Sequence, residues 1–163
     1  MESQQILSQQ LGELLDQHHL VLTTAESCTG GGVSAAITDI AGSSAWFDRA
    51  FITYSNEAKM EMLGVAEQTL QSFGAVSEQT VEEMVKGAVA NSNANIGVSI
   101  SGIAGPGGAT EDKPVGTVCF GWADETGWLK VATYHFAGDR SQVRQQAVET
   151  ALKVLYEKLL SHS

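Results

Sequence analysis

The 163-residue chain has 43% hydrophobic residues, 17% charged residues and a formal net charge of −10. Its length suits one domain over residues 1–163, and only nine Lys and Arg leave no basic footprint for nucleic acid. No apolar run approaches the roughly 20 residues of a membrane helix, and the polar N-terminus lacks a basic signal-peptide start. We therefore expect a cytoplasmic protein with no nucleic-acid or membrane partner. Two cysteines and four histidines without ligand spacing predict no disulfide scaffold, metal or other cofactor.

The beginning of the chain predicts a helix, a strand and a second helix. Apolar residues recur at helical spacing as far as His18, and an apolar run over Leu20–Thr24 is typical of a strand. A glycine-rich turn, Glu26–Gly32, then leads into a helical pattern over Val33–Ile40. The first N–H groups of a helix lack partners and carry positive potential, which favours an anion or a developing oxyanion at this turn. The alternative is a plain turn that uses glycine for its positive φ.

The next segment places a lysine in an unusual position. A loop of small residues, Ala41–Ser44, precedes a strand in the second half of Ala45–Thr53. Ser55 or Asn56 then caps a short helix that runs to Leu63 and stops at Gly64. Either cap puts Lys59 in the first turn, where the helix dipole disfavours a cation. The lysine is therefore either functional or an ordinary solvated surface residue.

The remaining chain continues the alternation of helices and strands. The pattern predicts helices over Glu67–Phe73 and from Ser77 onward, a strand over Ile96–Ser101, a glycine-rich loop over Gly102–Gly108, strands over Val115–Ala123 and Trp128–Phe136, and a last helix whose capping box is Asp139 with Gln142. Turn residues between the two late strands indicate an antiparallel hairpin.

These elements predict an α/β fold, a three-layer α/β/α sandwich around a mixed, mostly parallel five-stranded sheet. In open sheets of this class, ligands bind outside the carboxyl ends of the strands. That rule gathers the loops Glu26–Gly31, Tyr54–Lys59 and Ser101–Gly108 at one edge. Arg140 joins them if the last helix starts nearby.

The glycine loops match neither a P-loop nor a dinucleotide-binding fingerprint, and no histidine is placed to complete a Ser-His-Asp triad. Ser27 therefore needs a lysine or tyrosine as its activating partner. Lys59, with a pKa lowered by burial, is the candidate base, and Tyr54 is a candidate proton relay. Backbone N–H groups around Thr29 to Gly31 are the expected oxyanion donors. Cys28 is the rival nucleophile, although a lone cysteine more often packs in the core.

Several longer motifs resemble one known family. They are TAESCTGG (24–31), DIAGSSAWF (39–47), TYSNEAK (53–59), GAVSE (74–78), SISGIAGP (99–106), KPVGTV (113–118) and GDR (138–140). In the same order, they resemble the CinA C-terminal domain family over about residues 5–160, in particular its stand-alone nicotinamide-nucleotide amidases.

The resemblance implies an activity and a site. The activity is hydrolysis of the carboxamide of nicotinamide mononucleotide to nicotinate mononucleotide and ammonia, in NAD recycling, by a serine amidohydrolase without metal or cofactor. Its matching catalytic positions are Ser27, Tyr54 and Lys59. It also implies an anticodon-binding-domain-like fold and a homo-oligomer.

The chemistry of this substrate suggests the binding residues. The 5′-phosphate needs donors, and the nicotinamide ring is cationic. The candidates for substrate binding are Glu26, Thr29, Gly30, Gly31, Ser43, Ser44, Arg49, Ser101, Gly102, Gly105 and Arg140. Glu26 is equally well explained as a cap or ion-pair partner. Two alternative functions stay open: a non-catalytic nucleotide-binding or regulatory domain, and an amidase for another small amide.

Overall fold

A computed structural model describes residues 2–161. In chain order the elements are α1 (Glu2–Gln17), β1 (Leu22–Glu26), α2 (Gly32–Thr38), a short 3₁₀ turn η1 (Ser43–Ala45), β2 (Phe47–Ile52), α3 (Asn56–Leu63), α4 (Glu67–Phe73), α5 (Glu78–Ala90), β3 (Ile96–Gly102), β4 (Thr117–Asp124), β5 (Leu129–His135) and α6 (Arg140–Leu160). None of the helices within these residues is long and apolar enough to cross a bilayer.

The five strands form one mixed sheet in the order β2-β1-β3-β4-β5. β1 pairs in parallel with β2 and β3, whereas β4 is antiparallel to both of its neighbours, so four of the five strands point the same way. At the carboxyl end of β1, Glu26 pairs with Ile52 of β2 and Ile100 of β3. The loops that follow these three strands therefore leave the sheet at one edge.

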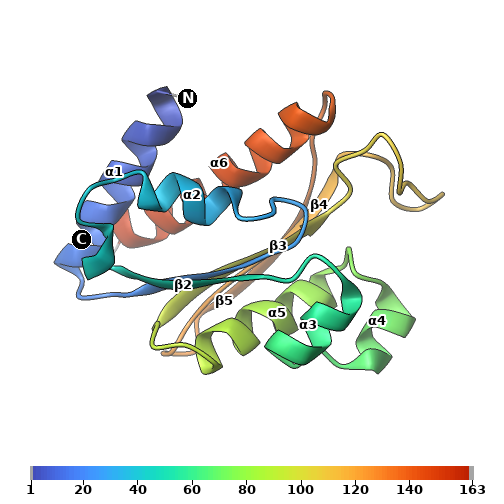
Figure 1. The fold of residues 1–163 in the computed structure, drawn as a ribbon, viewed down its shortest axis with the longest axis horizontal. Coiled ribbons are helices and arrows are strands. Elements are labelled where there is room, and N and C mark those ends of the chain that lie inside the picture. The colour runs from blue at the N-terminus through green and yellow to red at the C-terminus, as the bar shows by residue number, and fades with distance from the viewer. Residues whose placement is uncertain (1, 162–163) are drawn as a thin grey trace.

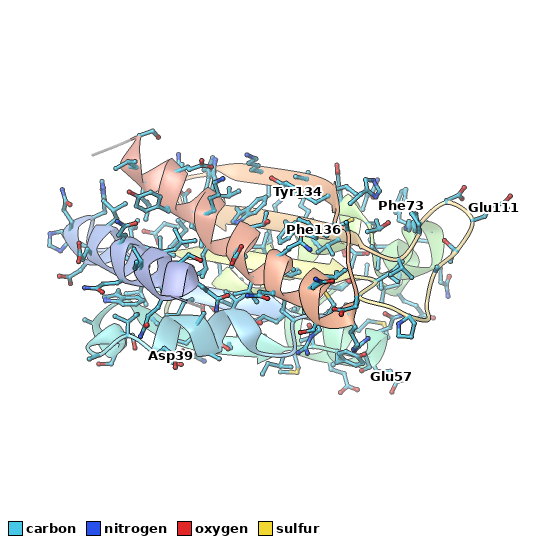
Figure 2. The ribbon with its side chains drawn as sticks, turned by 90° about the horizontal axis from the view of Figure 1, so that it is seen from above. Asp39, Glu57, Phe73, Glu111, Tyr134 and Phe136 are labelled. Atoms are coloured by element: carbon cyan, nitrogen blue, oxygen red, sulfur yellow. The ribbon has the colours of Figure 1, made fainter. Side chains whose placement is uncertain are left out.

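Helices cover both faces of the sheet, as the sequence predicts (Figure 1). α1, α2 and α6 lie on one face, and α3, α4 and α5 lie on the other. The larger apolar cluster fills the space under α1, α2 and α6, where Phe120 stacks on Trp122 with ring centroids 5.3 Å apart. Tyr134 and Phe136 extend this cluster beside α6 (Figure 2). The smaller cluster lies under α5.

Local capping chemistry sets the start of three helices as expected. The hydroxyls of Ser55 and Ser77 accept from the backbone N–H groups of Ala58 and Thr80, and Asp139 forms its capping box with Gln142.

β1 is the main departure from the predicted boundaries, since it begins at Leu22 and continues to Glu26. It lies between β2 and β3, and both neighbours keep pairing with it as far as Glu26. Glu26 is therefore the last residue of a central strand, and the turn begins at Ser27.

Candidate active site

A pocket of about 260 Å³ lies at the carboxyl edge of β1, β2 and β3. Its lining comes from the β1–α2 turn, the β2–α3 loop with the start of α3, the end of β3 with the first part of the loop that follows it, and the first residue of α6. The lining residues are Ser27, Cys28, Tyr54, Asn56, Lys59, residues 101–105, Gly107, Gly108 and Arg140, with Ala75 and Val76 beside them. At this end of the molecule Figure 2 places Glu57 of α3 and Glu111, at the tip of the loop between β3 and β4.

A serine and a lysine from different loops meet in this pocket. Lys59 Nζ lies 3.0 Å from Ser27 Oγ, 3.0 Å from the Thr53 carbonyl oxygen and 3.2 Å from the Tyr54 carbonyl oxygen. Ser27 Oγ is also within 3.4 Å of the Tyr54 carbonyl oxygen. An ammonium at Lys59 donates to all three oxygens. A neutral amine keeps two N–H donors for the carbonyls and turns its lone pair to Ser27, which is the geometry of a base.

Burial increases the fraction of Lys59 that is a neutral amine near neutral pH. The Lys59 side chain is 1% exposed, and no carboxylate is among its partners. Desolvation by burial lowers its pKa from 10.5 to about 8. Its place in the first turn of α3 acts in the same direction, because the helix dipole opposes a cation there. The sequence argument that singled out this lysine thus has a physical basis.

Burial has the opposite effect on the pKa of Cys28: it raises the pKa of the thiol, whereas it lowers that of the Lys59 amine. Burial raises the pKa of its thiol to about 11, despite the nearby Arg144 and Lys59. The thiol is protonated at neutral pH, and only a thiolate is a strong nucleophile. Of the two candidate nucleophiles, Ser27 has the base beside it.

Glu26 does not face the pocket as a partner for a cationic ring. Its carboxylate is fully buried and accepts five hydrogen bonds, from the hydroxyls of Thr24 and Thr29 and from the N–H groups of Gly31, Val33 and Ser34. From the end of β1, the carboxylate therefore caps the N-terminus of α2. This arrangement favours the capping role over the ring-binding role for Glu26, and it uses Thr29 Oγ1 as well.

The same cap changes which amides are free for an oxyanion. The Gly31 N–H donates to Glu26 and the Gly30 N–H donates to the Ser27 carbonyl oxygen, so these two expected donors are occupied. Within residues 2–161, the N–H group of Thr29 has no acceptor, and that of Cys28 contacts only the sulfur of its own side chain. The expected donors therefore shift toward the nucleophile, to Cys28 and Thr29.

Arg144 is a residue that the sequence reasoning missed. From the second turn of α6 it donates to the carbonyl oxygens of Cys28 at 3.0 Å and Thr29 at 3.2 Å. Its spacing of four residues from Arg140, on one helix face, was the available signal.

Arg140 and the loop after β3 form the outer part of the pocket. The Arg140 guanidinium donates to the Gly105 carbonyl oxygen at 2.8 Å, which ties the start of α6 to this loop. Within the described chain, the N–H groups of Ala104, Gly105, Gly107 and Gly108 have no protein acceptor. Ser101 and Gly102 line the inner part of the pocket. A cation with several free amides is suited to an anionic group.

Three expected phosphate ligands lie elsewhere. Ser43 and Ser44 form η1, before β2 begins, and Arg49 pairs with Asp48 at 2.6 Å near the amino end of the sheet. None of them lines the pocket. The structure therefore does not bring these three residues to the pocket within one chain, because they precede or lie inside β2 whereas the pocket lies beyond its carboxyl end.

Tyr54 reaches the site through its backbone. Its carbonyl oxygen contacts Lys59 and Ser27, whereas its side chain is 64% exposed at the pocket and its phenol has no hydrogen bond to any described residue. The geometry therefore gives the phenol no part in the contact between base and nucleophile.

A second hollow of about 580 Å³ lies against β4, β5 and the start of α5, and several of its polar side chains already have hydrogen-bond partners. Thr133 Oγ1 donates to Glu78 and Ser77 caps α5. No group of three or more His, Cys, Asp or Glu in the described chain could hold a metal ion.

Comparisons with known proteins agree with the motifs. The model of the CinA C-terminal domain matches residues 4–159. The chain is 54% identical over 157 residues to nicotinamide-nucleotide amidohydrolase PncC of Escherichia coli K12, covering 96% of this chain and 95% of that protein. Crystal structures of competence/damage inducible protein CihA from Agrobacterium tumefaciens (43% identity, TM-score 0.92, covering 93% of each chain) and of a CinA superfamily protein from Klebsiella pneumoniae (39%, TM-score 0.93, covering 97% of this chain and 98% of that one) share the fold.

Proposed function

Because the chain belongs to the CinA C-terminal domain family, we propose that it hydrolyses the carboxamide of nicotinamide mononucleotide to nicotinate mononucleotide and ammonia, within NAD recycling. The observation that carries this proposal is the 3.0 Å contact between Ser27 Oγ and the buried, carboxylate-free amine of Lys59. A 54% identical relative named nicotinamide-nucleotide amidohydrolase supports the choice of substrate.

The first half of the reaction forms an ester on Ser27. Neutral Lys59 takes the hydroxyl proton as Ser27 Oγ attacks the carboxamide carbon. The carboxamide oxygen becomes an oxyanion, for which the N–H groups of Cys28 and Thr29 are donors. The Lys59 ammonium then gives its proton to the departing nitrogen, ammonia leaves, and the C–N bond has been exchanged for a C–O bond.

The second half hydrolyses that ester. A water molecule occupies the place that ammonia has left and gives a proton to Lys59 as it attacks the ester carbon. Collapse of the second tetrahedral intermediate breaks the C–O bond to Ser27, which regains its proton from Lys59. The product's carboxyl group keeps the second water proton and loses it to solvent to become nicotinate, and both protein groups return to their starting protonation states.

The outer pocket serves the phosphate in this proposal. Arg140 and the free N–H groups of the loop after β3 bind the phosphate, while the exposed ring of Tyr54 covers the nicotinamide at the pocket mouth. In a chain of net charge −10, a cation and unpaired amides gathered at one pocket are a reason to expect an anionic ligand there.

An ammonia-release assay with the purified protein tests the proposal. Nicotinamide mononucleotide should release ammonia, free nicotinamide should react far more slowly because it lacks the phosphate, and Ser27→Ala should abolish turnover. Tight binding of the mononucleotide without ammonia release would favour the non-catalytic alternative. Equal rates with both amides would favour an amidase of broader specificity.

We also propose that the protein works in the cytoplasm and that it is a homo-oligomer, the second because the chain resembles the family in its motifs. Sedimentation of the full chain as a monomer at assay concentration would contradict the second part.

A further inference from the structure

One cation holds the turn that carries Ser27 from the side of α6. Arg144 donates from Nε to the Cys28 carbonyl oxygen and from Nη2 to the Thr29 carbonyl oxygen, at 3.0 and 3.2 Å. A Cβ at Gly30 would lie in ordinary contact with Nη2, at 3.5 Å, so it is the positive φ of 56° that favours glycine beside the guanidinium. Because a guanidinium is planar and presents its donors in a fixed fork, it holds two consecutive carbonyl groups as one rigid unit.

The first of these contacts sets the direction of the Thr29 N–H. In a trans peptide unit the C=O and N–H groups point to opposite sides. Arg144 holds the carbonyl of the Cys28–Thr29 unit, so the N–H of that unit points away from α6. This N–H has no acceptor in residues 2–161. A cation at the carbonyl oxygen also draws electron density through the peptide unit and makes the N–H a stronger donor.

The second contact reaches the Cys28 N–H through two peptide units in series. Arg144 holds the Thr29 carbonyl, and the N–H of that same unit, which belongs to Gly30, donates to the Ser27 carbonyl oxygen at 3.0 Å. The Ser27 carbonyl in turn belongs to the unit whose N–H is that of Cys28. Hydrogen bonds arranged in such a chain polarise one another. Both of these amides of the turn are thus the ends of chains that begin at Arg144.

We propose that Arg144 is a positioning residue for the reaction at Ser27: it orients and polarises the Cys28 and Thr29 amides as donors to the oxyanion. The proposal rests on the proposed amide hydrolysis and deepens it. Arg144 does not line the pocket, so it acts on the reaction through the turn and does not touch the substrate. Its effect falls on the transition state. The carboxamide oxygen of the bound substrate is neutral and needs these donors less than the oxyanion does.

Steady-state kinetics of ammonia release from nicotinamide mononucleotide test this assignment with Arg144→Met and Arg144→Lys. The Met variant should lose about 100-fold in kcat, the effect of weakening an oxyanion donor, while KM changes less than about twofold. The Lys variant keeps a cation near one carbonyl and should recover about tenfold over Met. Lys153→Met, which removes an exposed cation of the same helix, is the matched control and should behave as the wild type.

A spectroscopic readout separates positioning from folding. In the ¹H–¹⁵N spectrum of Arg144→Lys, the Cys28 and Thr29 amide protons should shift upfield, while amides of β3 such as Gly97 stay in place. This measurement also decides the matter if the Met variant does not fold.

Three results would overturn the assignment: wild-type kcat in Arg144→Met, a raised KM with unchanged kcat, or unshifted Cys28 and Thr29 amides in a folded Lys variant. A wild-type protein that releases no ammonia would instead refute the proposed function, on which the assignment depends.

Discussion

The proposed base makes a sharp prediction about how the rate depends on pH. Only neutral Lys59 accepts the Ser27 proton, and burial lowers its pKa from 10.5 to about 8. At pH 7 roughly one tenth of the molecules then carry the neutral amine, against roughly one in 3000 for a lysine at its ordinary pKa. Burial thus raises the reactive fraction by roughly 300-fold at neutral pH. We expect log(kcat/KM) to rise with unit slope up to pH 8 and to level off above it.

The assay is initial-rate ammonia release from pH 6.8 to 9.5, with a blank lacking the protein subtracted at each pH. This range lies above the second ionisation of a phosphate monoester, near pH 6, so the substrate phosphate does not titrate within it. It also lies below the raised pKa of Cys28, about 11. Of the two pocket groups with a shifted pKa, Lys59 and Cys28, only Lys59 therefore titrates in this window.

Lys59→Arg is the matched variant, because it keeps a cation of similar length that never becomes neutral. We expect it to lose at least about 1000-fold in kcat/KM at every pH, with no break in the profile. A flat wild-type profile from pH 6.8 to 9.5, or more than a tenth of wild-type activity in Lys59→Arg, would each refute a lysine base. A rate that still rises with unit slope at pH 9.5 would refute the lowered pKa of Lys59.

Five further substitutions probe the turn and its surroundings. Ser27→Ala should abolish ammonia release whereas Cys28→Ala should keep most of it, and the reverse pattern would move the nucleophile to the thiol. Tyr54→Phe should leave kcat within about threefold, because only its carbonyl touches Lys59; a 100-fold loss would restore the phenol as a proton relay. Glu26→Gln should lower the free energy of unfolding by roughly 3 kcal/mol in urea titrations, since a charged acceptor of five hydrogen bonds is replaced by an amide, and unchanged stability would contradict the cap. Protonated Lys59 destabilises the fold by roughly 3 kcal/mol below pH 8, and this penalty fades as pH rises toward 10.5, so the stability of Lys59→Met relative to wild type should fall by roughly 2 kcal/mol between pH 7 and 10. A pH-independent difference would mean that the amine is not desolvated.

Local chemistry made much of the fold predictable. The caps at Ser55, Ser77 and Asp139 depend on a few neighbouring residues, and they were found from the sequence alone. The meeting of three loops at one edge followed from the direction of the parallel strands. The same rule, applied more strictly, would have excluded Ser43 and Ser44, since they precede β2 and so belong to the other end of the sheet.

Side-chain partners far apart in sequence were out of reach of this reasoning. Arg144 contacts the Thr29 carbonyl across 115 positions of the chain, and no local pattern indicates that contact. For Glu26 the sequence left two roles open, ring binding and capping. With the strand predicted to end at Thr24, the direction of its carboxylate could not be decided, whereas β1 continues to Glu26 and its carboxylate accepts from the N–H groups at the start of α2.

The charges around the turn explain how a lysine serves as base here without a histidine. Glu26 and Lys59 flank the same turn, and a carboxylate facing the amine would hold it in its charged form. The structure prevents this by satisfying Glu26 with two hydroxyls and three amides, all on the far side of the turn. Arg144 is likewise occupied by two carbonyls. The hydrogen-bond partners of Lys59 are all neutral, so desolvation by burial outweighs the influence of Cys28 and the pKa of the lysine falls. Glu26 and Arg144 thus stabilise the turn, and because the Glu26 carboxylate is satisfied there, it does not hold Lys59 in its charged form.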